Sequence, residues 1–297
     1  MKDARLAALA GTQFNRVSRN QLIELGVSDN AMAHRVATGR LLIAEQGVFA
    51  VAPLLEHDEW GRWMGATLTA AGSLLSHASA AAAWGLWPGQ RDFECVTRSG
   101  NGGPRRHGGV IVFRSRVLVG EGTRLRGIPI TTVERTLLDL AANTSERALA
   151  RVVREAVRLR LTSPEGLADQ IGRHFGRRGS GRLGAVLARY AGLPLRRARS
   201  GAEVRALELL RDAGRPLPQL NVRIAGEEAD LSWGHGRLIV EIDGGPFHLD
   251  RGEDARKQLR WESAGWTVRR ISSDDVYERP AALIALAPPV SVPRCPV

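Results

Sequence analysis

The stretch that decides the fold lies near the C-terminus and reads Glu228-Ala229-Asp230-Leu231-Ser232-Trp233, then Gly234-His235-Gly236, then Arg237-Leu238-Ile239-Val240-Glu241-Ile242-Asp243. The two glycines predict a tight turn, and the runs on either side predict the strands of a β-hairpin. Because side chains alternate along a strand, Glu241 and Asp243 share one face. If the turn holds two or four residues, Asp230 lies directly opposite Glu241.

Three carboxylates on one face of a sheet repel each other and raise at least one pKa unless a cation joins them. An unpaired carboxylate in a strand as apolar as that of Glu241 is costly to bury. A hard divalent ion with oxygen ligands resolves both problems, and Mg²⁺ is typically held by one or two carboxylates plus phosphate and water. Such an ion generates a nucleophilic hydroxide and stabilises charge on a phosphodiester. Solvated strand-end acids that prevent aggregation are the open alternative.

Regular elements surround this hairpin. A helix from Ser200 carries an apolar face and ends at Gly214, and Glu203 completes a capping-box pattern with Ser200. A second helix covers Asp254 to Ala264, and a strand follows from Trp266 to Ile271, with Trp266 expected in the core. The sequence therefore predicts a C-terminal domain over 200–290, built as a mixed sheet flanked by helices.

The first 55 residues predict a winged helix-turn-helix. Ser18 and Gln21 form a capping box, Ser28 caps the next helix, and a hairpin follows around Gly47. In a winged helix the second helix of the pair enters the major groove. Its predicted DNA-binding residues are Asn30, His34, Arg35, Thr38 and Arg40. Residues 1–50 hold only six basic against four acidic residues, so a dimerisation or packing module is the alternative.

Residues 60–165 predict an α/β connector, and residues 166–199 an Arg-rich helical linker. The glycine-rich segment between Ser99 and Gly109 lacks the order of a phosphate-binding loop and predicts a flexible turn. The expected class for the whole chain is α/β (α+β).

Composition bounds the function. Of the 297 residues, 43% are hydrophobic, which is typical of a globular protein. The net charge of +11 indicates a polyanionic partner. Of the 42 basic residues only Lys2 and Lys257 are lysine, and residues 196–297 are nearly neutral with 16 basic and 15 acidic residues. Two cysteines exclude a disulfide framework. No apolar run reaches the roughly 18 residues of a membrane span, so a cytoplasmic protein without a membrane partner is expected.

The order of the C-terminal motifs resembles the PD-(D/E)XK nuclease superfamily, and in particular domains similar to very-short-patch-repair (Vsr) endonucleases. The motifs that carry the resemblance are Glu203, Asp230, Glu241-Ile242-Asp243-Gly244, Phe247-His248, Arg256 and Gly265-Trp266-Thr267-Val268. Residues 1–165 resemble the abortive-infection antitoxin family (AbiEi-like), through the winged helix and the stretch from Ile130 to Leu140.

This resemblance implies a restriction-endonuclease-like sheet and a role for each matching residue. Asp230 and Glu241 would bind Mg²⁺ or Mn²⁺, with the carbonyl of Ile242 as a third ligand, and Glu203 would be a helix-borne acid nearby. His248 would transfer a proton, and Arg256 would contact the phosphate or brace the acids. Asp243 stands where the superfamily has lysine. The lysine's role must pass to His248 or Arg256, or the site is weaker than usual.

Three functions remain open. The first is a metal-dependent endonuclease acting on double-stranded DNA, which the facing carboxylates favour. The second is a non-catalytic, antitoxin-like transcriptional regulator with a nucleotidyltransferase-like toxin partner, which Asp243 and the neutral C-terminal third favour. The third is an enzyme on the same scaffold that cleaves RNA or nucleotides.

Overall fold

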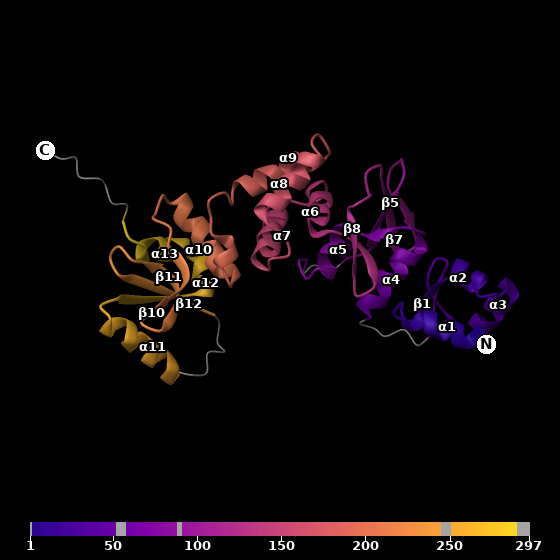
Figure 1. Ribbon diagram of the computed structural model, residues 1–297, viewed down its shortest axis with the longest axis horizontal. Coiled ribbons are helices and arrows are strands. Elements are labelled where there is room, and N and C mark those ends of the chain that lie inside the picture. The colour runs from indigo at the N-terminus through magenta and orange to yellow at the C-terminus, as the bar shows by residue number, and fades with distance from the viewer. Residues whose placement is uncertain (1, 52–57, 88–90, 245–250, 290–297) are drawn as a thin grey trace. The chain divides into compact units, whose positions relative to one another are not determined.

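The computed structural model describes residues 2–51, 58–87, 91–244 and 251–289. The chain forms two compact units. The first holds Met1–Val153 and Pro164–Val186, and the second holds Arg154–Ser163 and Leu187–Val297. Helices and mixed sheets alternate along the chain, so the α+β class is confirmed (Figure 1). Among the described residues no helix is both long and apolar enough to cross a membrane.

The N-terminal part of the first unit is a helical cluster on a small antiparallel sheet with strand order β1-β3-β2. The Ser18 hydroxyl accepts the Gln21 N–H and the Gln21 side chain accepts the Ser18 N–H, so both halves of the predicted capping box are present. The elements are α1 (Lys2–Gly11), β1 (Arg16–Ser18), α2 (Arg19–Glu24), α3 (Asp29–Ala37), β2 (Leu42–Glu45) and β3 (Val48–Ala50).

The rest of the first unit is built on a six-stranded mixed sheet with order β6-β7-β5-β4-β9-β8. The strands are β4 (Leu74–Leu75), β5 (Glu94–Ser99), β6 (Arg105–His107), β7 (Val110–Ser115), β8 (Gly122–Leu125) and β9 (Ile128–Thr131). The helices are α4 (Glu59–Thr69), α5 (His77–Ala83), α6 (Val133–Ala141), α7 (Glu146–Arg158), α8 (Pro164–Arg173) and α9 (Ser180–Ala188), and the last residues of α7 and of α9 belong to the second unit.

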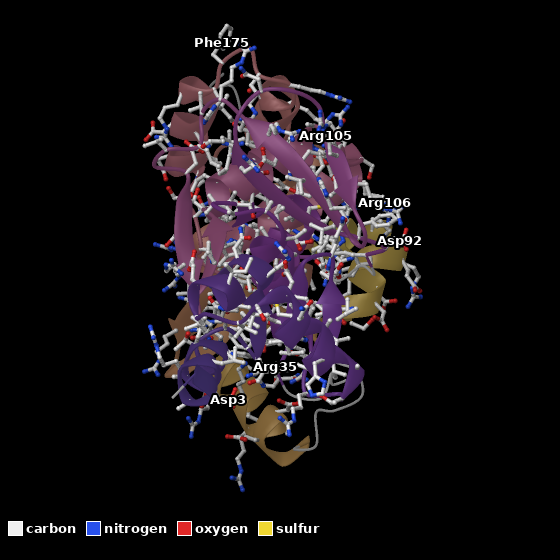
Figure 2. All side chains as sticks on the ribbon, turned by 90° about the vertical axis from the view of Figure 1, so that its right-hand side faces the viewer. Asp3, Arg35, Asp92, Arg105, Arg106 and Phe175 are labelled. Carbon is white, nitrogen blue, oxygen red and sulfur yellow. The ribbon has the colours of Figure 1, made fainter. Side chains whose placement is uncertain are left out.

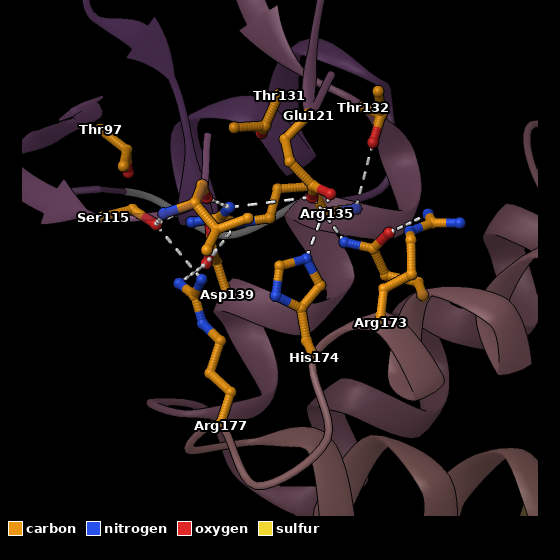
Figure 3. Close-up of polar contacts among 12 residues, drawn as sticks. Thr97, Ser115, Glu121, Thr131, Thr132, Arg135, Asp139, Arg173, His174 and Arg177 are labelled. Atoms are coloured by element: carbon orange, nitrogen blue, oxygen red, sulfur yellow. Dashed lines mark hydrogen bonds and ion pairs between the residues drawn. The ribbon is translucent and has the colours of Figure 1, made fainter. Parts of the chain in front are cut away.

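A buried polar cluster lies where α6 meets the segment after α8 (Figure 3). The Arg135 side chain is fully buried, and its Nε lies 3.0 Å from Oδ1 of Asp139. Arg177 Nη2 lies 2.8 Å from the same oxygen. Glu121 Oε1 lies 3.1 Å from His174 Nε2. Because buried charges are tolerated only when paired, this cluster fixes how α6 and the segment around His174 pack together.

The second unit contains a four-stranded sheet with order β10-β11-β12-β13. Its last two strands are parallel and are connected through α11, whereas the other neighbours are antiparallel. In Figure 1 α11 covers one face of the sheet, and α10 and α13 lie on the other. The elements are η1 (Leu195–Arg197), α10 (Gly201–Asp212), β10 (Gln219–Ile224), β11 (Glu227–Trp233), β12 (Leu238–Asp243), α11 (Arg251–Ser263), β13 (Thr267–Ser272), α12 (Ser273–Glu278) and α13 (Pro280–Leu286).

The aromatic anchor of this sheet is Trp261, which is fully buried and donates its indole N–H to the Ile224 carbonyl at 3.0 Å. Trp266, which the sequence placed in the core, is only partly buried and packs at the edge of the same apolar cluster. Trp261 takes the central place because it projects from α11 onto the sheet. Trp266 precedes the first residue of β13.

Candidate functional site

The hairpin of β11 and β12 brings two carboxylates together. The register pairs Trp233 with Leu238 and Leu231 with Val240, so the next position sets Asp230 opposite Glu241. At this position carboxylate oxygens accept hydrogen bonds from backbone N–H groups of the facing strand. The Asp230 N–H donates to Glu241 Oε1 at 3.0 Å, and the Ile242 N–H donates to Asp230 Oδ2 at 2.9 Å. The two carboxyl groups therefore lie beside each other at one point of the hairpin.

Burial and mutual repulsion make it unfavourable for both carboxyl groups of this pair to be ionised. Glu241 is buried, and Asp230 is half-buried. Burial and, after it, the charge of Glu241 raise the pKa of Asp230 to about 6, although the hydrogen bond from the Ile242 N–H partly opposes the rise. The charge of Glu203 also raises it, which places a third carboxylate within electrostatic reach. Near neutral pH the site therefore carries more negative charge than its surroundings stabilise.

Among the residues that the structure describes, Lys257 is the one cation in direct contact with the pair. It projects from α11 and its Nζ lies 2.7 Å from Glu241 Oε2. The same ammonium lies 4.7 Å from the centroid of the Trp261 ring. The sequence interpretation missed this residue because Lys257 lies outside the strand motif. One signal was available, since Lys257 is one of two lysines in a chain whose other 40 basic residues are arginine.

Glu203 is buried on α10 and holds neighbouring segments in place. Its Oε2 accepts the Asn221 side-chain N–H at 2.7 Å and the Arg199 backbone N–H at 2.9 Å. Its own N–H donates to the Ser200 hydroxyl at 3.1 Å. The capping pattern is therefore half confirmed, because the carboxylate caps Arg199 instead of Ser200. A role for Glu203 beside a metal stays a prediction.

The other predicted site residues do not join the pair. Asp243 Oδ1 lies 3.5 Å from Nη1 of Arg270, so an arginine neutralises the acid that stands in the lysine position. Arg256 is exposed, and within the described residues its side chain makes no hydrogen bond or ion pair. The adjacent Lys257 contacts Glu241 instead, because the side chains of neighbouring residues on a helix point about 100° apart. His248 lies outside the described residues.

The pair fits a hard divalent cation in charge and donor type. Carboxylate oxygens are the ligands such ions prefer, and the raised pKa of Asp230 marks negative charge that a cation would stabilise. No group of three or more His, Cys, Asp or Glu side chains is arranged for a metal among the residues that the structure describes. Asp230 and Glu241 would therefore need water, a backbone oxygen or phosphate to complete a coordination shell.

The predicted DNA-binding residues lie on α3 and directly after it. Asn30, His34, Thr38 and Arg40 are exposed. Arg35 is partly covered, and its Nη2 lies 2.7 Å from Oδ1 of Asp3 on α1 (Figure 2). Four of the five side chains are therefore accessible, and the fifth would have to leave an intramolecular ion pair to contact DNA.

Comparison with known proteins gives limited similarity. No family model matches the chain. Two curated proteins of Mycobacterium tuberculosis, Uncharacterized protein MT2308 and Uncharacterized protein Rv2248, are each 36% identical to it over 115 residues. That match covers 35% of this chain and 42% of each relative, so the chain spans less than half the length of the relatives it matches. A crystal structure of RV2827C protein from Mycobacterium tuberculosis is 20% identical, with a TM-score of 0.40, over 62% of this chain and 74% of that one.

Proposed function

We propose that the chain is a DNA-binding protein whose C-terminal domain hydrolyses DNA with Mg²⁺ or Mn²⁺, as an endonuclease of the PD-(D/E)XK kind. In this proposal residues 1–55 are a winged helix-turn-helix, 60–165 an AbiEi-like connector, 166–199 an Arg-rich linker, and 200–290 the nuclease-like domain. The observation that carries the proposal is the contact between Lys257 and Glu241 beside Asp230.

That contact answers the strongest objection raised by the sequence. The superfamily pattern needs a lysine beside its two acids, and Asp243 occupies that position here. Lys257 reaches Glu241 from the helix that follows the strand, so the same three functional groups meet although their order along the chain differs. An ammonium held this way can orient an attacking water and stabilise negative charge that develops on a phosphate.

The chain's own residues then divide the work. Asp230 and Glu241 would hold the cation, which when bound lowers the pKa of water and stabilises charge on the phosphodiester. Glu241 also fixes Lys257 through the 2.7 Å ion pair. Glu203 positions Asn221 and the Arg199 backbone through two hydrogen bonds. The exposed residues of α3 would bring DNA to the protein.

Cleavage of supercoiled plasmid tests the proposal. The purified protein should nick or cut plasmid DNA in Mg²⁺ or Mn²⁺ and remain inactive with a chelator. Glu241→Gln should reduce the rate by at least about 10²-fold, because it removes a charge from the cation-binding pair. Glu262→Gln is the matched control: it removes an exposed carboxylate of the same helix, α11, whose Oε1 accepts a hydrogen bond from Gln258, and it should leave the rate unchanged.

Two results would redirect the proposal. Cleavage of RNA without cleavage of DNA would show that the substrate is RNA and not DNA. If the wild type cleaves no nucleic acid with any divalent ion, the proposed enzyme is wrong.

The second candidate is a non-catalytic, antitoxin-like regulator that uses the nuclease-like fold as a binding platform. One observation favours it: both oxygens of Glu241 already accept protein hydrogen bonds, from the Asp230 N–H and from Lys257. A purely structural pair would look the same. Such a regulator would bind DNA without cutting it and would form a complex with a nucleotidyltransferase-like toxin.

A further inference from the structure

The second unit contains a basic pocket that neither the strand motif nor the acid pair explains. It has a volume of about 580 Å³, and four arginines line it: Arg158, Arg160, Arg197 and Arg199. None of the described residues that line it is acidic. Arg197 and Arg199 belong to the nearly neutral segment from 196 to 297, and the fold adds Arg158 and Arg160 to them, so the pocket concentrates positive charge that the sequence sum conceals.

Two of these arginines shape the pocket. Arg158 binds Glu155 through its Nε at 2.9 Å, and its Nη1 donates to the Arg199 carbonyl at 2.6 Å. Arg199 in turn pairs with Glu228. The Asn221 side chain donates to the Arg197 carbonyl at 2.8 Å. The segment from Arg197 to Arg199 is therefore held from both sides, as a preformed ligand site requires.

The other two arginines have no side-chain partner among the residues that the structure describes. Arg160 and Arg197 are exposed, and within the described chain neither guanidinium makes a hydrogen bond or an ion pair. Arg160 also has a φ of +58°, a left-handed conformation that costs a non-glycine residue energy. Two unpaired guanidinium groups on a fixed frame are suited to bidentate contacts with phosphate.

The pocket is connected to the acid pair through one residue. The amide of Asn221 that holds the Arg197 carbonyl also donates to Glu203 Oε2 at 2.7 Å, and the charge of Glu203 reaches Asp230. By the strand register Asn221 lies opposite Asp230, between the neighbouring pairs Leu220–Leu231 and Val222–Ala229. Asn221 therefore links the basic pocket to the candidate hydrolytic site through its hydrogen bonds to the Arg197 carbonyl and to Glu203.

We infer that this pocket binds the sugar–phosphate backbone of duplex DNA next to the hydrolytic site. Among the described residues its apolar lining is aliphatic, with Leu159 and Val222 but no aromatic side chain, so these residues offer no stacking surface of the kind on which single-stranded bases are held. Contacts made only to phosphate give affinity without sequence preference. The inference rests on the proposed function for its role in cleavage, whereas the binding itself does not depend on it.

The test is DNA binding in a chelator, where no cleavage occurs. Fluorescence anisotropy with a labelled duplex would compare the wild type with the double variant Arg160→Gln/Arg197→Gln. Loss of two phosphate contacts should raise Kd about 10-fold near physiological salt and reduce the slope of log K against log salt by about 2. The matched control is Arg223→Gln/Arg269→Gln, which removes two exposed arginines of the same unit outside the pocket, and its Kd should change less than about 2-fold.

A second variant separates binding from folding. Arg160→Gly removes the guanidinium but favours the left-handed backbone, so it should weaken binding about 3-fold and melt no lower than the wild type. Equal Kd values and slopes for the pocket variant and the control would overturn the inference, as would a wild type that does not bind duplex DNA at low salt. If the pocket variant still cleaves DNA and its Kd is unchanged, only the inference about the pocket is wrong. If binding depends on the pocket but the protein never cleaves DNA, only the proposed nuclease activity is wrong.

Discussion

Lys257 is the residue on which the catalytic proposal depends most directly. Lys257→Met keeps the aliphatic stem over Trp261 but removes the ammonium from Glu241. We expect the cleavage rate to fall about 10²-fold with little change in the Kd for DNA, because the charge acts on the developing transition state. Single-turnover cleavage and anisotropy measure the two effects separately.

Arg256→Met is the informative comparison for this prediction. The two residues are adjacent, but Arg256 is exposed and does not contact the acids. If Lys257 holds the role, Arg256→Met should retain at least about half of the activity. The opposite order of effects would return the role to Arg256, as the sequence motif suggested.

At this scale the sequence predicted the acids better than the cation. Asp230 and Glu241 were predictable because a four-residue turn and strand alternation determine which residues face each other. Lys257 was not predictable in the same way. Its contact with Glu241 depends on how α11 packs on the sheet, and that packing is set by distant residues such as Ile224, which accepts the Trp261 indole N–H.

Among the elements, α4 shows how one side chain can join two parts of a fold. Asp58 caps this helix, since its Oδ1 accepts the Gly61 N–H at 2.8 Å. Its Oδ2 lies 2.7 Å from Nη2 of Arg16, a buried residue of β1. Asp58→Ala should lower the free energy of unfolding by about 3 kcal/mol, because it removes a cap and leaves a buried guanidinium without its partner.

Denaturant unfolding of the full chain measures this loss. Asp29→Ala is the control, because the Arg19–Asp29 pair is exposed on both sides and should contribute less than about 1 kcal/mol. A cost for Asp58→Ala no larger than that of the control would show that the Arg16–Asp58 contact does not stabilise the packing of α4 on β1.

Elements with a local signal were predictable, and elements that depend on a partner were not. The capping residues Ser18 and Ser28 predict the starts of two helices, and both caps are present in the structure. β6 gave no signal, because it is three exposed residues in a glycine-rich segment that become a strand only by pairing with β7. β1 is equally short and depends on β3.

Across the whole molecule, charge summed along the sequence misrepresents charge in space. The last 102 residues are nearly neutral in sum. In the structure, however, the second unit holds an acid pair at Asp230 and Glu241 and a separate pocket in which Arg197 and Arg199 of that stretch meet Arg158 and Arg160. The sequence showed the excess of arginine but had no means of showing which guanidinium groups remain unpaired, because pairing is decided by tertiary contacts.

The two units also contain carboxyl groups whose pKa values shift in opposite directions. In the second unit, burial raises the pKa of Asp230 to about 6, so the ionised form destabilises the folded state at neutral pH. In the first unit, burial raises the pKa of Glu121, but hydrogen bonds from Gln170 and His174 outweigh it and leave the pKa below its ordinary value of 4.5. Ionised Glu121 therefore stabilises the folded state.

Acid should consequently strengthen one unit before it weakens the other. As pH falls through 6 toward 3.8, Asp230 takes up its proton and its cost disappears, so hydrogen-exchange protection of β11 and β12 in metal-free protein should rise. The contribution of Glu121 is fully present above 4.5 and is lost as pH falls below that value, so protection of α6 and α8 should then fall. Asp230→Asn should abolish only the first change and Glu121→Gln only the second. A parallel response of both regions, unaffected by either variant, would mean that other groups control the acid stability of the chain.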